Sequence, residues 1–128
     1  MLGHESLGRV LDPGPKGGLK EGDLVVGIVR RPDPIPCPNC AVGEWDMCRN
    51  GQYTERGIKQ IHGFMSERWR IESEYTVKVD SSLGPLGVLL EPTTISSCWI
   101  DLKGRSLVQN QNRLSSGEKP VLSILQSD

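Results

Sequence analysis

The sequence is poor in aromatic side chains, the bulkiest groups that can fill a protein core. Its 128 residues include three tryptophans, two tyrosines and one phenylalanine, against fifteen glycines and nine prolines. Glycine and proline are typical of turns, so this composition favours short strands joined by turns over long helices. A chain of this length forms about one domain. We therefore expect a mainly β domain with short helices.

The sequence also lacks an excess of one charge and a long apolar run. Fifteen basic and sixteen acidic residues leave a net charge of -1, with no block of like charges. This pattern argues against nucleic acid or a membrane as a partner. The longest apolar stretch, LVVGIV, is too short to cross a bilayer, and the N-terminal residues do not resemble an export signal. We therefore expect a cytoplasmic protein.

Four segments have the composition of strands. A nearly continuous β-branched run makes residues 24–29 the strongest of them. Alternation at Tyr75, Val77 and Val79 indicates another. The four segments are part of 3–12, then 24–29, 62–71 and 74–80.

The remaining segments are less regular. Four prolines at two-residue intervals within residues 31–52 exclude a helix interior and a sheet centre, which predicts a loop. Leucines within residues 86–90 have helical spacing, but Pro92 requires a break or a new helix start. From residue 102 onward the chain is polar and weakly patterned, with one apolar clump at residues 121–125.

Three cysteines lie in the proline-rich loop, at Cys37, Cys40 and Cys48. A Cys-x-x-Cys pair lets two thiolates bind one ion across a tight turn, and structural zinc takes four Cys or His ligands in a closed tetrahedron. In a reducing cytosol such a cluster is more often metal-binding or catalytic than disulfide-bonded. A bound metal would hold a loop that lacks regular hydrogen bonding.

Two other interpretations of these cysteines remain open. A thioredoxin-like redox pair would place Cys37 after a strand and Cys40 inside a helix, and the surrounding sequence indicates neither. The three cysteines can also be an unligated cluster, because no fourth cysteine lies nearby. Cys98 lies far along the chain beside Trp99, where we expect a small buried apolar residue.

Six segments occur in an order and at separations that resemble one known family. They are GHES, EGDLVV, CPNCAVGEWDMC, GQYTERGI, HGFMSE and LLEPTT. Together they resemble the glucose dehydrogenase branch of the zinc-dependent medium-chain alcohol dehydrogenases, over about residues 2–95. The resemblance implies a partial GroES-like β-barrel at residues 1–95, with a structural-zinc lobe at 31–50, that lacks the family's first strands and its Rossmann domain. Residues 96–128 are then a divergent, poorly patterned tail.

The resemblance also implies a structural zinc. In the family this zinc is held by four cysteines, and Cys37, Cys40 and Cys48 match the last three of them. Pro34 stands at the first position and cannot ligate. We therefore expect either a site completed by the carboxylate of Asp33, since zinc accepts such oxygens, or a lobe without zinc.

A second, catalytic zinc is implied by the other motifs. They assign His4 and Glu5 of GHE and Glu91 of LLEPTT as ligands, with Glu5 also catalytic. In the family this zinc polarises the substrate hydroxyl while a nicotinamide accepts a hydride. Glu55 of YTERGI resembles a carboxylate that accepts hydrogen bonds from sugar hydroxyls. Taken singly, these residues are more typical of ordinary surface groups, and His62, which matches no ligand position, is expected to be structural.

The activity implied by the resemblance is that of an NAD- or NADP-dependent oxidoreductase acting on a sugar or alcohol hydroxyl. No Gly-x-Gly-x-x-Gly turn for a dinucleotide occurs in residues 96–128, and the family's first catalytic-zinc ligand precedes GHE. We therefore expect a fragment that is inactive by itself. The alternative is a zinc-binding or interaction module without enzymatic activity, which pairs open sheet edges as a homo-oligomer.

Overall fold

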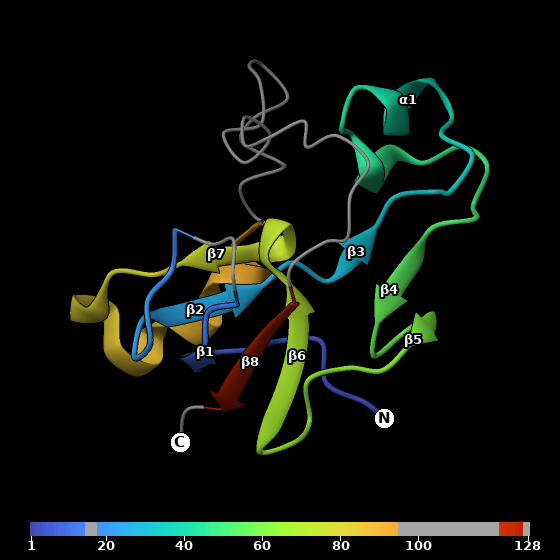
Figure 1. Ribbon diagram of the computed structural model, residues 1–128. Coiled ribbons are helices and arrows are strands. Elements are labelled where there is room, and N and C mark those ends of the chain that lie inside the picture. Colours follow the sequence, from blue (N-terminus) through green and yellow to red (C-terminus); the bar gives the residue numbers. More distant parts are fainter. Residues whose placement is uncertain (15–17, 95–120, 127–128) are drawn as a thin grey trace. The chain divides into compact units, whose positions relative to one another are not determined.

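The computed structural model describes residues 1–14, 18–94 and 121–126 of the chain. They form two compact units (Figure 1). The first unit contains Met1–His4 and Val29–Met65, and the second contains Glu5–Ile28 and Ser66–Asp128. Each unit has its own sheet, so each is described separately.

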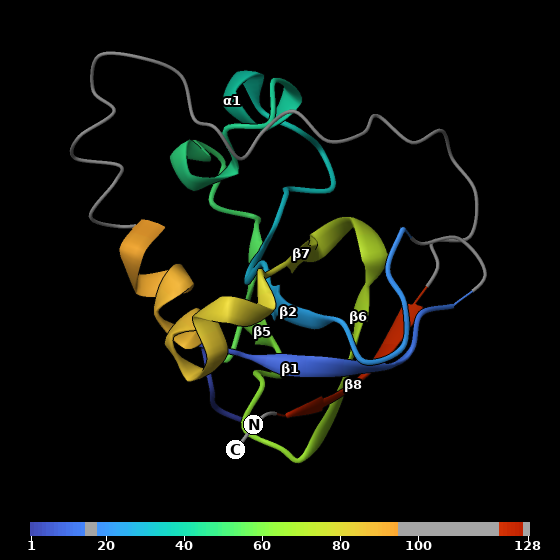
Figure 2. The ribbon, with the colours of Figure 1, turned by 90° about the vertical axis from the view of Figure 1, so that its left-hand side faces the viewer.

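The second unit is a five-stranded antiparallel sheet with the order β6-β8-β1-β2-β7. In Figure 2, β1 runs between β2 and β8. Strands this short, joined by turns, confirm the mainly β fold class expected from the composition. The bounds are β1 (Gly8–Asp12), β2 (Leu24–Gly27), β6 (Arg68–Glu72), β7 (Thr76–Lys78) and β8 (Val121–Gln126).

The core of this sheet is a set of paired apolar side chains on neighbouring strands. Ile124 of β8 pairs with Val10 of β1 and with Trp69 of β6. Two residues earlier in β8, Leu122 pairs with Ile71 of β6. All five side chains are buried, and because alternate residues share a face, they lie on one side of the sheet. Burial of each such side chain stabilises the fold by about 1.5 to 3 kcal/mol.

The strand β8 was not among the predicted strands. The apolar clump at residues 121–125 is too short to identify as a strand by itself, yet it forms β8 because it is paired on both sides. Residues 95–120, most of the expected tail, lie outside the described residues. The division of the chain at residue 95 stays a prediction.

The predicted alternation at Tyr75, Val77 and Val79 is wrong. Tyr75 and Val79 are buried, but Val77 is exposed. The reason is that Tyr75 ends a 3-10 turn, η2 (Ser73–Tyr75), and only Thr76–Lys78 form the strand. The period of two therefore does not extend across the three residues.

A long 3-10 segment, η3 (Ser81–Leu89), follows β7 in the second unit. Its N-cap is Asp80, whose carboxylate accepts a hydrogen bond of 2.8 Å from the Ser82 N–H. Gly84 interrupts η3 with a φ of 48°, a conformation that favours glycine. Residues 90–94 are helical, and Pro92 lies in their first turn, where a backbone N–H has no helical acceptor. A new helix start near Pro92, one of the two expected outcomes, is therefore confirmed.

The first unit contains a small sheet and a cysteine-containing lobe. The sheet has the order β3 (Arg30–Arg31), β4 (Thr54–Arg56) and β5 (Gln60–Ile61). The lobe, residues 31–50, is not purely a loop as predicted, because it contains two short helices. Pro38 occupies the first helical position, where proline is tolerated. The helices are α1 (Pro38–Ala41) and η1 (Trp45–Met47).

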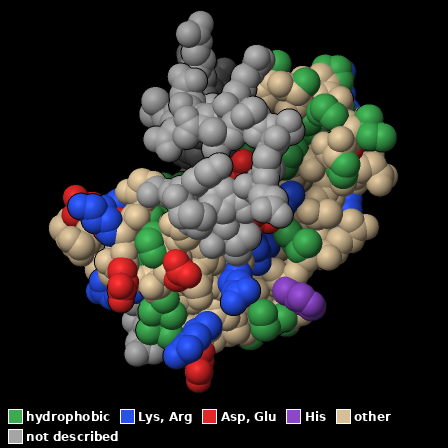
Figure 3. All heavy atoms as spheres, in the orientation of Figure 1, with side chains coloured by type: hydrophobic (Ala, Val, Ile, Leu, Met, Phe, Trp, Pro, Cys, Tyr) green, Lys and Arg blue, Asp and Glu red, His purple; other side chains and the backbone are tan. Residues whose placement is uncertain are grey.

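Charged side chains of both signs are interspersed on the surface of the described residues. On the face drawn in Figure 3, basic and acidic groups lie near one another instead of gathering by sign. Within residues 1–14, 18–94 and 121–126, no helix combines the length and the apolar character needed to cross a membrane.

Candidate metal and substrate site

The backbone at His4 is fixed by a short segment that runs beside it in the first unit. The N–H groups of residues 63–65 donate hydrogen bonds to the carbonyl oxygens of residues 1–3 at 2.9 to 3.0 Å. A side chain has no room at Gly63, because its Cβ would lie 2.2 Å from the Gly3 carbonyl oxygen. Gly3 also has a φ of 103°, which favours glycine. The GHE motif is therefore held at its start by close backbone contacts.

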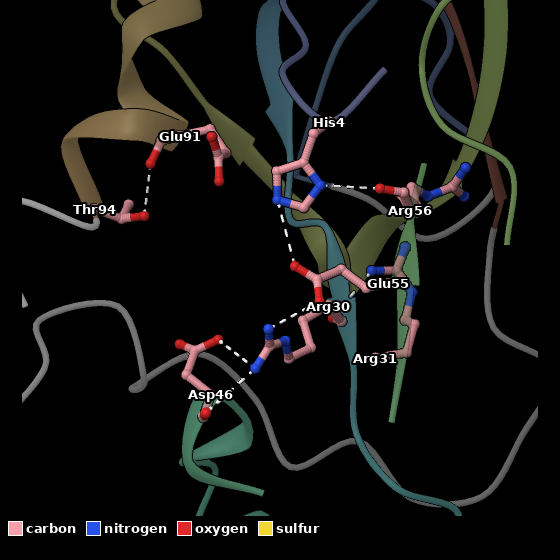
Figure 4. A network of polar contacts seen from close by, with 8 residues as sticks. All are labelled: His4, Arg30, Arg31, Asp46, Glu55, Arg56, Glu91 and Thr94. Atoms are coloured by element: carbon pink, nitrogen blue, oxygen red, sulfur yellow. Dashed lines mark hydrogen bonds and ion pairs between the residues drawn. The ribbon is translucent and has the colours of Figure 1, made fainter. Parts of the chain in front are cut away.

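The His4 ring is oriented by the backbone of β4. Its Nδ1 lies 3.0 Å from the carbonyl oxygen of Arg56, and a carbonyl can only accept, so Nδ1 carries the hydrogen. In the neutral ring, Nε2 is then an acceptor, and it faces Glu55 Oε1 at 3.4 Å (Figure 4). Two acceptors at this distance repel unless a proton or a cation lies between them. A ring nitrogen fixed through a backbone carbonyl is the usual arrangement of a metal-ligating histidine, so His4 fits a zinc ligand.

Glu55 is buried, with 7% of its surface exposed. Its Oε2 accepts a hydrogen bond of 2.8 Å from Arg30 Nη2, and its Oε1 faces His4. The turn after β4 also fixes its backbone, since Glu55 and Lys59 exchange N–H to carbonyl bonds of 2.8 Å. The carboxylate can still accept a substrate hydroxyl, because two ionised oxygens have about four acceptor positions. Its assignment to sugar binding stays a prediction.

Arg30 is a site residue that the sequence analysis missed. It stands directly opposite Glu55 in the β3-β4 ladder, so the two form a cross-strand pair of opposite charge. Its Nη1 donates to the Asp46 carbonyl oxygen at 3.2 Å, and its guanidinium lies 4.2 Å from the centre of the Tyr53 ring. Only the register of the two short strands, which a single sequence does not specify, would have identified this pair.

The three lobe cysteines converge on one point. Their Sγ atoms lie within 4.8 Å of one another. Cys37 caps α1, and its sulfur accepts hydrogen bonds from the backbone N–H groups of Arg49 at 3.4 Å and Cys40 at 3.5 Å. These N–H groups lower the pKa of the Cys37 thiol to about 6, the Arg49 contact having the larger effect. Burial raises the pKa of the Cys40 thiol. A stabilised thiolate at Cys37 suits a metal site, because the thiolate is the metal ligand.

Asp33 lies beside this cluster, whereas Pro34 lies at the surface. Asp33 is buried, with 4% of its surface exposed, and Pro34 is exposed. The Asp33 Oδ1 accepts a hydrogen bond of 2.8 Å from the Ile35 N–H, and Oδ2 lies 4.0 Å from Cys48 Sγ. Three sulfurs and a carboxylate oxygen are donors that zinc accepts, and the three sulfurs are the ones that converge in the structure. Asp33 as the fourth ligand stays a prediction.

The other predicted residues lie in the second unit or at the surface. Glu5 is exposed and Glu91 is half-buried, both in the second unit, while His4 belongs to the first. The Glu91 carbonyl accepts a bond of 2.7 Å from Thr94 Oγ1 (Figure 4). Joint ligation of one zinc by these three residues stays a prediction. His62 is exposed, with Nδ1 3.1 Å from the N-terminal amine, and Cys98 lies outside the described residues.

Comparison with known proteins identifies the family. The family model of the alcohol dehydrogenase GroES-like domain matches residues 1–81. This chain therefore belongs to the alcohol dehydrogenase GroES-like domain family, as the six motifs from GHES to LLEPTT predict.

The relatives are glucose dehydrogenases. Glucose 1-dehydrogenase of Methanocella arvoryzae is 37% identical over 126 residues, which cover 94% of this chain and 35% of that protein. Glucose 1-dehydrogenase of Metallosphaera sedula is 46% identical over 92 residues, covering 72% of this chain and 25% of that protein. The chain thus spans about a third or less of the length of these curated relatives.

A solved structure has the same fold. The Haloferax mediterranei glucose dehydrogenase, determined in complex with NADP, zinc and gluconolactone, matches with a TM-score of 0.70 and 39% identity. The match covers 79% of this chain and 28% of the other. The fold class expected from the resemblance, a partial GroES-like domain, is therefore confirmed, and zinc and NADP are cofactors of this structural relative.

Proposed function

We propose that this chain is the GroES-like part of a zinc- and NAD(P)-dependent oxidoreductase that oxidises a hydroxyl of glucose or a similar sugar. The observation that carries the proposal is the orientation of His4. Its Nδ1 is tied to the Arg56 carbonyl, so that Nε2 is directed toward a buried carboxylate. The glucose dehydrogenase relatives supply the substrate class and the cofactors.

The proposed mechanism assigns each residue one task. A catalytic zinc with His4 among its ligands would supply Lewis-acid chemistry at the reacting hydroxyl. His4 would offer Nε2 to the metal, while its Nδ1–H is bonded to the Arg56 carbonyl, which keeps the ring in one tautomer. Glu55 accepts a hydrogen bond from a second sugar hydroxyl and orients the ring of the substrate. Glu5, which is exposed in the structure, is proposed as a ligand that would bind zinc directly or through water.

The cysteine lobe has a structural task in this proposal. Cys37, Cys40, Cys48 and Asp33 would close a tetrahedron around a second zinc. Its support is the convergence of three sulfurs within 4.8 Å and the approach of Asp33 Oδ2 to Cys48. The lobe, which the structure describes in full, has no core of large apolar side chains, so the metal would stabilise it instead.

We infer that the 128 residues alone do not transfer hydride. No two glycines in the sequence are separated by a single residue, so the dinucleotide-binding turn Gly-x-Gly-x-x-Gly is not encoded here. We also propose a cytoplasmic location, because Cys37, Cys40 and Cys48 are unpaired and a reducing compartment keeps thiols free of disulfides.

Zinc stoichiometry tests the proposal. In chain dialysed against zinc and then against metal-free buffer, the His4→Gln variant should lose one zinc per chain relative to wild type, measured by mass spectrometry of metal content. The matched control is His62→Gln, because His62 is the second of the two histidines and is exposed. Equal zinc content in wild type and His4→Gln would contradict the catalytic-zinc assignment. Glucose-dependent reduction of NADP by the chain alone would contradict the inference of inactivity.

A further inference from the structure

Arg30 connects the cysteine lobe to the carboxylate that faces His4. One nitrogen of its guanidinium contacts Glu55 Oε2 at 2.8 Å, and the other contacts the Asp46 carbonyl oxygen in η1 at 3.2 Å (Figure 4). We propose that Arg30 is a positioning residue that transmits the metal state of the cysteine lobe to His4 through Glu55. This inference rests on the proposed function, because it gives a purpose to both metal sites.

The lobe end of this connection depends on the cysteine cluster. Asp46 lies in η1, between Cys40 and Cys48, and the Cys48 N–H donates to the Trp45 carbonyl at 3.2 Å. A metal bound by Cys40 and Cys48 would hold both ends of the segment that contains η1. The Asp46 carbonyl would then stay at a fixed position, whereas the Asp46 side chain is 82% exposed and its 3.7 Å contact with Arg30 adds little.

The other end is defined by the β3-β4 ladder. Arg30 and Glu55 are paired in register, and Glu55 Oε1 faces His4 Nε2 while Oε2 accepts from Arg30. A displaced guanidinium would release Oε2, and the carboxylate would turn away from the histidine. The connection from η1 to His4 therefore runs through the side chains of Arg30 and Glu55. Arg30 contacts the Asp46 carbonyl at one end and Glu55 at the other.

The guanidinium is held in one orientation by its surroundings. Arg30 and Lys59 each lie 4.2 Å from the centre of the Tyr53 ring. Arg30 Nε is buried and has no hydrogen-bond partner among the described residues. A buried N–H without a partner costs free energy, so an arginine without other constraints would adopt a rotamer that pairs its Nε. The contacts of Nη1 and Nη2 therefore decide the orientation of Arg30.

The experiment follows the His4 ring while the lobe is loaded. The full chain is labelled with ¹⁵N-histidine, which gives ring signals from two residues, and His62→Gln assigns them. One equivalent of cadmium is added, because soft thiolates prefer soft metals, and thiolate-to-cadmium absorption reports that the cysteines are loaded. In wild type we expect the His4 ring signals to shift with this absorption. Cys48→Ser should abolish the shift, which excludes direct binding of cadmium to His4.

Variants of Arg30 decide the proposal. Arg30→Gln should lose most of the His4 shift while the thiolate absorption persists. Arg30→Lys should lose the His4 shift as well, since a single ammonium cannot reach Glu55 and Asp46 together. If Arg30→Gln does not fold, the Arg30→Lys variant decides the test. Arg49→Gln is the matched control and should keep the shift, because the contact of Arg49 with Cys37 uses its backbone N–H.

Two results would overturn the coupling. One is a His4 shift in both Arg30 variants that equals the wild-type shift. The other is an unmoved His4 signal in wild type although the thiolate absorption is complete. Absence of the thiolate-to-cadmium absorption would show that the cysteines bind no metal. That result would overturn both the coupling and the structural-metal proposal. The zinc test of His4→Gln remains independent of it.

Discussion

The two units of the chain bury different kinds of side chain. In the second unit the buried side chains are mainly apolar and are paired across a five-stranded sheet, as at Val10, Trp69 and Ile124. In the described part of the first unit, Phe64 is the only large apolar side chain that is buried. Its other buried side chains are those of Asp33, Cys37, Cys40 and Glu55.

This difference in burial changes what each unit needs for its stability. Apolar burial is non-directional and stabilises a sheet without any ligand. A buried carboxylate or thiolate costs free energy unless a hydrogen bond, a counter-ion or a metal compensates it. The first unit therefore depends on specific partners, and its fold and its function are expected to be lost together.

Removal of a cysteine ligand should have the largest effect. Structural zinc in small peptides binds with about 10 to 16 kcal/mol, so Cys48→Ser should abolish stoichiometric zinc at the lobe and destabilise the first unit. The five-stranded sheet of the second unit should stay folded. Metal analysis and circular dichroism check the two statements. Cys98→Ser is the matched control, and an equal loss of zinc in that variant would show that the cluster is assigned wrongly.

A cavity in the five-stranded sheet should destabilise the second unit and leave zinc binding unchanged. Ile124 is fully buried between Val10 and Trp69, so Ile124→Ala should lower the free energy of unfolding of the second unit by about 2 to 5 kcal/mol. Zinc content of the chain should not change. Leu125→Ala, at a position that is 37% exposed, should cost much less in the same urea titration. Zinc loss in Ile124→Ala at a temperature where the sheet is folded would contradict the separation of the units.

Substitution of Asp33, the proposed fourth ligand, should reduce zinc affinity less than substitution of a cysteine. Asp33→Asn keeps an oxygen for the Ile35 N–H but removes the charge, and we expect zinc affinity at the lobe to fall at least about tenfold. Asp33→Cys should retain or raise the affinity, because four thiolates suit zinc. Competition with a chromophoric chelator measures both. Unchanged affinity in Asp33→Asn would show that the carboxylate does not ligate.

The smallest predicted effect concerns the cap of η3. The Ser82 N–H holds the pKa of Asp80 below its ordinary value of 3.8, so the ionised carboxylate favours the folded state. That stability is present above pH 3.8 and is lost as the pH falls through the lowered pKa. Asp80→Ala should therefore be slightly less stable than wild type at neutral pH, and the difference should shrink below pH 3.8. Urea titrations across this range check it, with the exposed Glu67→Ala as control.

Local patterns in the sequence predicted the parts of the molecule that depend on local chemistry. The spacing of Cys37, Cys40 and Cys48 identified three atoms that converge, and the β-branched run at residues 24–29 identified the strand β2. The prolines were expected to exclude a helix interior and predicted a loop, but Pro38 begins a short helix, because the first helical position needs no N–H.

Features that depend on distant pairing were not predictable. β8 forms because β1 and β6 pair with it across large separations in sequence, and nothing in six residues specifies those partners. Arg30 was missed for the same reason, since its opposition to Glu55 follows from the β3-β4 register. The pairing of Arg30 with Glu55 therefore requires the structure, whereas the cysteine cluster is visible in the sequence.

Amide hydrogen exchange with and without zinc tests most directly the claim that a metal replaces an apolar core in the first unit. Exchange is measured by mass spectrometry on zinc-loaded chain and on chain stripped with a chelator. We predict that stripping removes protection from residues 33–48 and leaves the strands of the second unit protected. Equal protection of residues 33–48 in both samples would contradict the account.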